Sequence, residues 1–300
     1  MGTKILLALI VMAGVASAQP APPKITIGIY APSVEFGTAQ ARLTYVQGLA
    51  KAIEQSTSIK TDAYAYASMS ALKKANVDYA IVDGPCFATN LGWKLLANAT
   101  IDGGTSRTYA LWSSAGNTMQ SLRGKKLAYV QTGCNDDGFI FNAMLETEVD
   151  PTFFSGRPPE NDLTAAVAAV QSYKTAQGVF APASAVKSLT KVFDTGSVPN
   201  PAFVEVNAKM PNNISAAVGA AVSGYGGSGA ISGWTKPNRD PYQSLASRFT
   251  PNRKGGVFAS PDAVRLNPND VLAAVPSLNE PFFVAVRHHF VRGPARMGGE

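Results

Sequence analysis

Residues 122–148 read LRGKKLAYVQTGCNDDGFIFNAMLETE, a pattern of strand, loop and helix. The apolar run Leu127–Val130 predicts a strand, a glycine-bearing loop follows at residues 131–138, and a helical pattern starts at Phe139. In open α/β sheets small ligands bind at such edges, because free backbone N–H groups and the helix dipole point there. We therefore expect residues 132–138 to form one wall of a ligand-binding cleft. The other wall must come from elsewhere in the chain.

The first residues have the pattern of a secretory signal peptide. Lys4 precedes an apolar run at residues 5–15, and residues 16–18 match an A-x-A cleavage pattern. The run is shorter than the roughly 20 residues that a membrane-spanning helix needs. We therefore expect residues 1–18 to be removed near Ala18, leaving an exported chain that is periplasmic or secreted.

Composition and charge are those of a globular protein. Hydrophobic residues make up 46% and charged residues 15% of the 300 residues, enough for one large domain or two lobes with proper cores. Lys and Arg number 26 against 20 Asp and Glu, but the basic residues are scattered and no basic run is interleaved with aromatics. This distribution predicts a solvated surface and no nucleic-acid partner.

Strands and helices alternate along most of the chain. The predicted strands are Lys24–Tyr30, 59–66, 77–82, Ser106–Ser113, Leu127–Val130, 175–180 and 203–206. The predicted helices are 38–55, 69–75, one ending near residue 96, one from residue 139, 163–173, one ending near residue 191, and 213–222. This alternation predicts an α/β fold with mixed, mostly parallel sheets.

The pattern weakens beyond residue 223. Glycine, serine and proline are frequent over residues 223–290, which we expect to be a loop-rich extension packed onto the rest of the fold. A late strand is predicted at residues 281–290 and a frayed tail at 291–300.

A second strand, loop and helix pattern occurs at residues 77–86, where the strand VDYAIV ends in DGPC. Each of the two loops contains a cysteine, Cys86 and Cys134. Both lie in loops of a chain expected in an oxidising compartment, so we expect a disulfide between them. A metal site formed by these cysteines with Asp83 and Asp136 is an alternative, but it has no characteristic spacing.

Four motifs in order resemble one protein family. They are VDYAIVDGP at residues 77–85, TMQSLRGKKLAYVQTGCNDDG at 118–138, AAVAAVQSYKTAQGVF at 165–180 and VPNPAFV at 198–204. In this order they resemble the substrate-binding proteins of phosphate/phosphite/phosphonate ABC transporters, which are type II periplasmic binding proteins. The resemblance extends from residue 24 to about residue 222.

The resemblance implies a two-lobed type II periplasmic-binding-protein fold. Lobe 1 would comprise residues 24–105 plus 201–290, and lobe 2 residues 106–196, with a ligand cleft between them. The loops at residues 83–86 and 132–138 would then face each other across the cleft. A disulfide between them would join the two walls, oppose opening and contribute about 3–4 kcal/mol of stability.

The resemblance also implies a mechanism and a set of ligand-binding residues. Closure of the lobes on a small ligand would allow docking on a membrane permease or a sensor, without a cofactor. The candidate ligand-binding residues are Tyr30, Asp83, Gly84, Cys86, Thr108, Thr132, Cys134, Asn135, Asp136 and Asp137.

The loop at residues 133–138 departs from the family pattern. The family loop reads G-S-T-S-G and holds an anion with hydroxyl and N–H groups, whereas this chain reads GCNDDG. A phosphonate would meet the carboxylates of Asp136 and Asp137, and that of Asp83 on the opposite wall, at a cost of several kcal/mol. We expect Asp136 or Asp137 to occupy the loop and helix N–H groups as a cap. The alternative is that they meet a cationic or hydroxylated ligand, or a metal.

Catalytic motifs are not found. The histidines are His288 and His289, far along the chain from Cys134, and no nucleophile elbow, zinc-protease motif or Walker loop occurs. We therefore expect a non-enzymatic solute-binding protein. The alternatives are an envelope interaction or sensor protein with a disulfide-locked cleft, and an exported thiol enzyme that uses Cys134.

Overall fold

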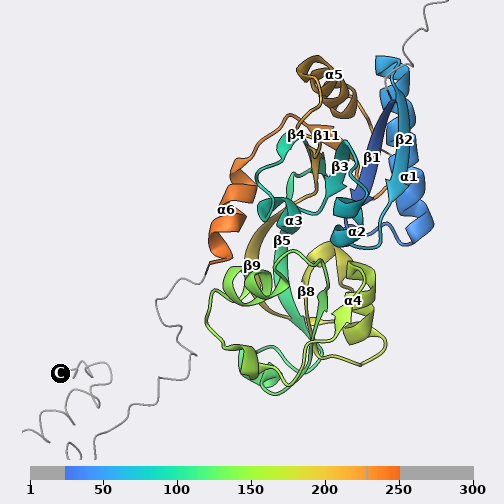
Figure 1. The fold of residues 1–300 in the computed structure, drawn as a ribbon. Helices are drawn as coiled ribbons and strands as arrows, with labels where there is room; N and C mark the ends of the chain where they lie inside the picture. The colour runs from blue at the N-terminus through green and yellow to red at the C-terminus, as the bar shows by residue number, and fades with distance from the viewer. Residues whose placement is uncertain (1–23, 228, 251–300) are drawn as a thin grey trace, which may run out of the picture. The chain divides into compact units, whose positions relative to one another are not determined.

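The computed structural model describes residues 24–227 and 229–250, which all fall in one compact unit. One group of strands comprises β1 (Lys24–Tyr30), β2 (Lys60–Ala65), β3 (Tyr79–Val82), β4 (Lys94–Thr100), β10 (Ala202–Glu205) and β11 (Gly233–Thr235). These form the first sheet, in the order β11-β4-β10-β3-β1-β2. Figure 1 labels β1, β2, β3, β4 and β11 of this sheet. The others are β5 (Ser106–Ser113), β6 (Leu127–Val130), β7 (Pro159–Glu160), β8 (Gly178–Pro182) and β9 (Thr190–Pro199). These form the second sheet, in the order β7-β6-β8-β5-β9.

Helices connect the strands and cover the sheets. The α-helices are α1 (Ala39–Thr57), α2 (Met69–Lys74), α3 (Gly84–Ala88), α4 (Leu163–Gln171), α5 (Asn212–Ser223) and α6 (Asp240–Arg248). The helix that follows β6 is a π-helix, η2 (Gly138–Met144). Short 3₁₀ turns are η1 (Met119–Leu122), η3 (Pro151–Phe153) and η4 (Ala183–Ala185). Among the described residues, no helix combines the length and the apolar character needed to cross a membrane.

The sheets are mixed, as predicted, but not mostly parallel. Of the nine strand pairings in the described part of the chain, four are parallel and five antiparallel. Four of the five antiparallel pairs arise where the chain changes sheets, and the fifth joins β11 to β4. The strand β5 is the first after the chain leaves the first sheet, and β10 is the first after it returns. The strand β10 runs antiparallel to both of its neighbours, β3 and β4. The strand β5 runs antiparallel to both of its neighbours, β8 and β9.

Two predicted helices are wrong. The helix expected to end near residue 96 stops at Ala88, and β4 follows as a strand paired with β10 and β11. The helix expected to end near residue 191 is the short turn η4, followed by β9, which pairs with β5. Both strands are held by partners distant in the sequence, and such tertiary pairing overrides local helix preference.

The described part of the loop-rich extension predicted from residue 223 contains two short elements, β11 and α6. Pro241 lies in the first turn of α6, where a missing N–H breaks no hydrogen bond, so it starts the helix instead of interrupting it. The predicted signal peptide 1–18, strand 281–290, histidines 288 and 289, and tail 291–300 lie outside the described residues.

Alternate residues of the first sheet face two different cores, as the period of a strand requires. On β3, Tyr79 and Ile81 pack into a core that includes residues of α1 and α5. Ala80 and Val82 face the other way, into a core shared with the second sheet and α6. The two sheets are therefore joined by a continuous apolar core as well as by the chain itself.

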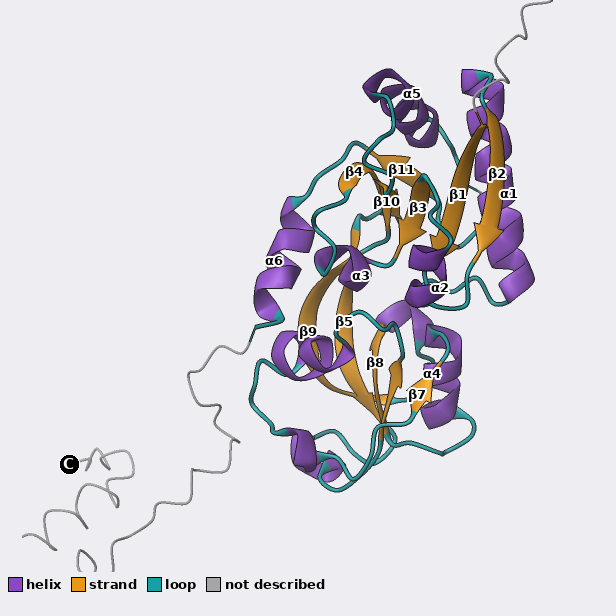
Figure 2. Cartoon of the chain, viewed as in Figure 1, coloured by secondary structure: helices purple, strands orange, loops and turns teal. Residues whose placement is uncertain are grey.

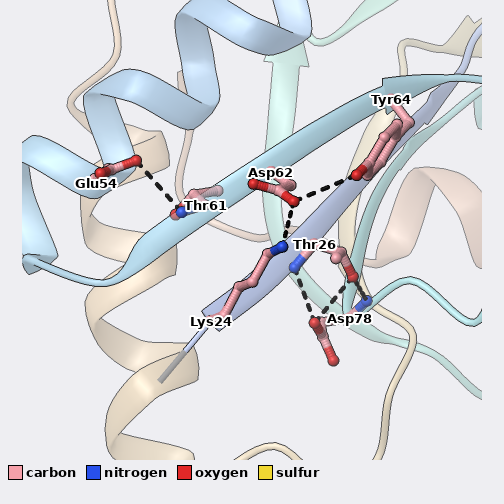
Figure 3. Close-up of polar contacts among 7 residues, drawn as sticks. All are labelled: Lys24, Thr26, Glu54, Thr61, Asp62, Tyr64 and Asp78. Carbon is pink, nitrogen blue, oxygen red and sulfur yellow. Dashed lines mark hydrogen bonds and ion pairs between the residues drawn. The ribbon is translucent and has the colours of Figure 1, made fainter. Parts of the chain in front are cut away.

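Polar contacts fix the N-terminal end of β1, which carries Tyr30 at its other end. The backbone N–H and hydroxyl of Thr26 donate to Asp78 Oδ2 at 2.9 and 3.0 Å (Figure 3). Lys24 and Tyr64 both contact the Asp62 carboxylate, at 2.6 and 3.3 Å. The contacts of Lys24 and Thr26 hold the start of β1 against β2 and against the segment before β3.

The helix α6, shown in Figure 2, contacts α3, η2 and β9. Near its start, the buried Tyr242 hydroxyl accepts a hydrogen bond from Asn98 of β4 at 3.1 Å. Near its end, Arg248 donates to the carbonyl of Ala143 in η2 and, at 3.1 Å, to that of Thr195 in β9. The helix therefore ties the first sheet to the second.

Candidate ligand-binding site

The two cysteine-bearing loops are covalently joined. Cys86 of α3 and Cys134 of the loop after β6 form a disulfide, with their Cα atoms 5.0 Å apart, and both are buried. The predicted pairing is thereby confirmed. The bond counts against the alternative metal site with Asp83 and Asp136 and against the thiol enzyme, because neither sulfur is a free thiol.

The Asp136 carboxylate turns back onto its own loop. Its Oδ1 accepts hydrogen bonds from the backbone N–H of Thr132, at 3.1 Å, and from the Thr132 hydroxyl. Its Oδ2 accepts from the Gly133 N–H at 3.1 Å. Asp136 therefore occupies N–H groups of the loop, but the predicted helix cap by Asp136 or Asp137 is not formed, because the Gly138 N–H at the start of η2 is bonded by Asn135.

The neighbouring residues act differently from the prediction. Asn135 adopts φ 62° and its side-chain oxygen accepts from the Gly138 N–H at 3.2 Å, so Asn135 contacts the start of η2. Asp137 makes no side-chain cap bond. Its exposed carboxylate pairs instead with Arg157.

Asp83 and Tyr30 lie on the opposite wall. Asp83 is 1% exposed and accepts from the Ser33 N–H at 2.8 Å. Burial raises the pKa of Asp83 to about 6, partly offset by the hydrogen bonds from Ser33 and by Arg107. The Tyr30 hydroxyl donates to the carbonyl of Gln131, at 3.1 Å, which links the end of β1 directly to the loop after β6. Burial raises the pKa of Tyr30, so the hydroxyl keeps its proton.

Two other predicted residues have different surroundings. A Cβ on Gly84 would lie 2.0 Å from the Pro199 carbonyl oxygen, so this glycine permits close packing of α3 against the end of β9. Thr108 is exposed on β5, and it lines neither of the cavities described below. The ligand-binding roles of the ten predicted residues stay predictions.

The space between the two loops is almost filled. The cavity there has a volume of about 30 Å³, enough for one or two water molecules. Its lining residues are Ser33, Pro85, Tyr109, Tyr129, Val130, Thr132, Asp136, Phe139, Ile140 and Phe180. This volume is far below the roughly 300–1,000 Å³ of typical small-molecule pockets.

A larger cavity of about 580 Å³ lies beside it, within the size range of small-molecule pockets. We call it the α2 pocket. Its lining residues are Tyr30, Ala67, Ser68, Met69, Ser70, Lys73, Lys74, Gln131, Thr132, Gly133 and Asn161. The sequence predicted only Tyr30 and Thr132 of this set. The sequence indicates Lys73 and Lys74 only as scattered surface charge, and the one local signal is that they fall in the last turn of the short helix that Ser68 caps.

Further contacts hold the walls together. Arg107, from the first strand after the chain changes sheets, donates to the Ser33 carbonyl at 2.9 Å and to the Asn200 side chain at 3.2 Å. The N–H of Leu163, at the start of α4, donates to the Pro32 carbonyl at 3.0 Å. The loop after β1 is thus fixed to elements of the second sheet at two points.

No protein-family model and no curated protein matches the chain. Among solved structures, the binding component of an ABC phosphonate transporter from Pseudomonas aeruginosa has a TM-score of 0.57 at 12% identity, over 77% of this chain and 90% of that one. The protein PhnD1 of Prochlorococcus marinus, in complex with methylphosphonate, has a TM-score of 0.58 at 10% identity, over 76% and 97%. The protein XAC2383 of Xanthomonas citri, bound to ATP, has a TM-score of 0.56 at 12% identity, over 75% and 96%.

These similarities establish the fold. The predicted resemblance to the phosphonate-binding proteins and the predicted α/β two-lobed fold are confirmed. The sheets change between Thr100 and Ser106 and between Pro199 and Ala202. The lobe boundaries proposed from the sequence, at residues 105 and 196–201, stay predictions.

Proposed function

We propose that this chain is an exported, non-enzymatic binding protein whose two lobes stay joined, and that it acts as an interaction or sensor protein for a membrane partner. The observation that carries the proposal is the disulfide between Cys86 and Cys134. A receptor that opens must separate the two loops that contain these cysteines. The bond, the Tyr30 contact with Gln131 and the helix α6 all oppose that separation.

Export is supported by the signal-peptide pattern at residues 1–18 and by the disulfide, because disulfides persist in oxidising compartments. A permease of an ABC transporter is the second candidate partner. The observation that favours it is the fold, which the chain shares with transporter binding proteins.

We do not expect this chain to bind a phosphonate at the loop of residues 132–138. Asp136 already fills the loop N–H groups, and the space there is about 30 Å³. Isothermal titration with methylphosphonate should therefore show no binding at this loop. Stabilisation by methylphosphonate that persists unchanged in Asp136→Ser would contradict the argument from charge.

Single-molecule fluorescence energy transfer tests whether the two lobes stay joined in solution. Dyes attached through non-natural amino acids at Tyr64 on β2 and at Tyr173 after α4 avoid the cysteines, and both positions are exposed. We expect one narrow population that no small-molecule probe shifts. The double variant Cys86→Ala, Cys134→Ala should add a second population of lower transfer efficiency. Two interconverting populations in the unaltered protein would overturn the proposal and favour the transport receptor.

A further inference from the structure

The α2 pocket differs in charge from the filled space beside it. Both of the charged side chains that line the α2 pocket are lysines, Lys73 and Lys74. Asp136 does not line the pocket, and its carboxylate is engaged in hydrogen bonds with the backbone N–H groups of Thr132 and Gly133. The pocket therefore has a positive lining, whereas the space between the two loops is lined by aromatic and apolar residues with one carboxylate.

The walls of the pocket are preformed. On one side, the Ser68 hydroxyl accepts from the Ala71 N–H at 3.1 Å and fixes the start of α2. Lys73 lies over the Trp93 ring, 5.7 Å from its centre. On the other side, Tyr30 holds Gln131, as described above. A ligand would meet this arrangement already in place, which lowers the entropy lost on binding.

The pocket is open to the solvent, because Ser70, Lys73, Lys74, Gln131 and Asn161 are all exposed. A ligand can therefore enter without any separation of the two cysteine-bearing loops. This is the property that a binding site needs in a protein whose lobes stay joined.

The lining indicates the chemical class of the ligand. Two ammonium groups favour an anion, and hydroxyl and amide groups such as those of Ser70, Gln131 and Asn161 favour hydroxyl groups on the ligand body. The volume of about 580 Å³ far exceeds that of an inorganic anion. The geometry points to the α2 pocket as the binding site of a hydroxylated organic anion. This inference rests on the proposed function, because it supplies the ligand that a joined-lobe binding protein would recognise.

Isothermal titration with glucose 6-phosphate and with citrate, against neutral glucose, tests the inference. We expect at least one of the two anions to bind and glucose not to bind, and the responding probe identifies the anionic group as phosphate or carboxylate. The dissociation constant should increase as the ionic strength rises to about 0.5 M, because salt screens the attraction between the lysines and the anion.

Variants locate the site. Replacing both lysines, by Lys73→Gln with Lys74→Gln, should weaken binding by about tenfold or more. Ser70→Trp, at an exposed position of α2, should fill the pocket and abolish binding while leaving both charges in place. Lys187→Gln removes one exposed lysine outside the pocket and should leave the dissociation constant unchanged. Unaltered circular dichroism and melting temperature confirm that each variant is folded.

The inference is overturned if neither anion binds at millimolar concentration, or if binding survives both the lysine replacements and Ser70→Trp. Its failure is distinguishable from failure of the proposed function. If neither anion binds but the energy-transfer experiment shows a single population, only the inference about the α2 pocket is rejected. If the unaltered protein shows two interconverting populations in that experiment, the proposal of joined lobes is rejected, whatever the pocket binds.

Discussion

Asp136 carries out within this chain what a bound anion would otherwise do. Its two carboxylate oxygens accept from Thr132 and Gly133, the groups that precede the helix η2. A carboxylate held four residues away in the sequence has a high effective concentration, so an external anion competes poorly with it. These hydrogen bonds support the prediction that a phosphonate is unfavourable at this loop, which stays a prediction.

Removal of this side chain should destabilise the loop. We expect Asp136→Ala to lower the free energy of unfolding by about 1–2 kcal/mol, because the N–H groups of Thr132 and Gly133 lose their acceptor. The matched control is Asp137→Ala, which removes an exposed carboxylate paired with Arg157 and should change the stability by less than about 0.5 kcal/mol. Urea denaturation measures both. Equal effects of the two substitutions would contradict the role given to Asp136.

Asp83 is the residue whose titration should be visible in the stability of the fold. Burial raises its pKa to about 6 in the folded chain, from the ordinary value 3.8. The folded state therefore binds more protons than the unfolded state between these two values, and the contribution of Asp83 to stability falls as the pH rises from about 4 to about 6. Above pH 6 the buried carboxylate is charged, and the contribution of Asp83 to the free energy of unfolding is lower than at low pH by roughly 2–3 kcal/mol.

The substitution Asp83→Asn removes the titration and retains an acceptor for the Ser33 N–H. We expect the variant to gain stability relative to the unaltered protein as the pH rises from 4 to 6, and the difference to stay constant above that range. Urea denaturation of both proteins over this pH interval measures the difference. A stability difference that does not vary with pH would show that Asp83 titrates normally.

At the scale of elements, α6 has the clearest structural consequence. Its buried Tyr242 hydroxyl contacts Asn98 of β4 and donates to the Asn200 carbonyl, at 2.9 Å, where the chain returns to the first sheet. Tyr242→Phe should cost about 1–3 kcal/mol, because it leaves buried partners unsatisfied. Tyr173→Phe, at a position 74% exposed, is the control and should have almost no effect in the same urea titration. A neutral Tyr242→Phe would mean that α6 is not fixed to the first sheet through this hydroxyl.

Elements that carry their own local signal could be predicted from the sequence. The strands β1, β5 and β6 have the predicted bounds, because each is a short apolar or alternating run between turn residues. The strands β4 and β9 could not be predicted, because their extended state depends on pairing with β10 and β5. The start of α6 was hidden by Pro241, which resembles a loop signal until its helical position is known.

The same distinction applies to the site. The pairing of Cys86 with Cys134 and the inward carboxylate of Asp136 follow from residue chemistry and loop positions, and both could be predicted. The α2 pocket could not, because it exists only where Tyr30, the helix α2 and the loop after β6 come together. Its lysines carry no local pattern that distinguishes them from surface charge.

At the scale of the whole molecule, the disulfide is the strongest single link between the two sheets. It closes a segment with a sequence separation of 48 residues, and such a closure contributes about 4 kcal/mol in the chain-entropy account. A shared apolar core and the helix α6 act in the same direction. The two sheets are therefore joined by a covalent bond, by a shared apolar core and by one helix, which is the arrangement that the proposed joined-lobe function requires.

The most direct test is mass-spectrometric peptide mapping of the exported protein, digested without reduction after blocking of free thiols. The joined-lobe account predicts no blocked cysteine and one linked pair of peptides, containing Cys86 and Cys134, which separates on reduction. Two blocked thiols, or a bond between two copies of the chain, would contradict it.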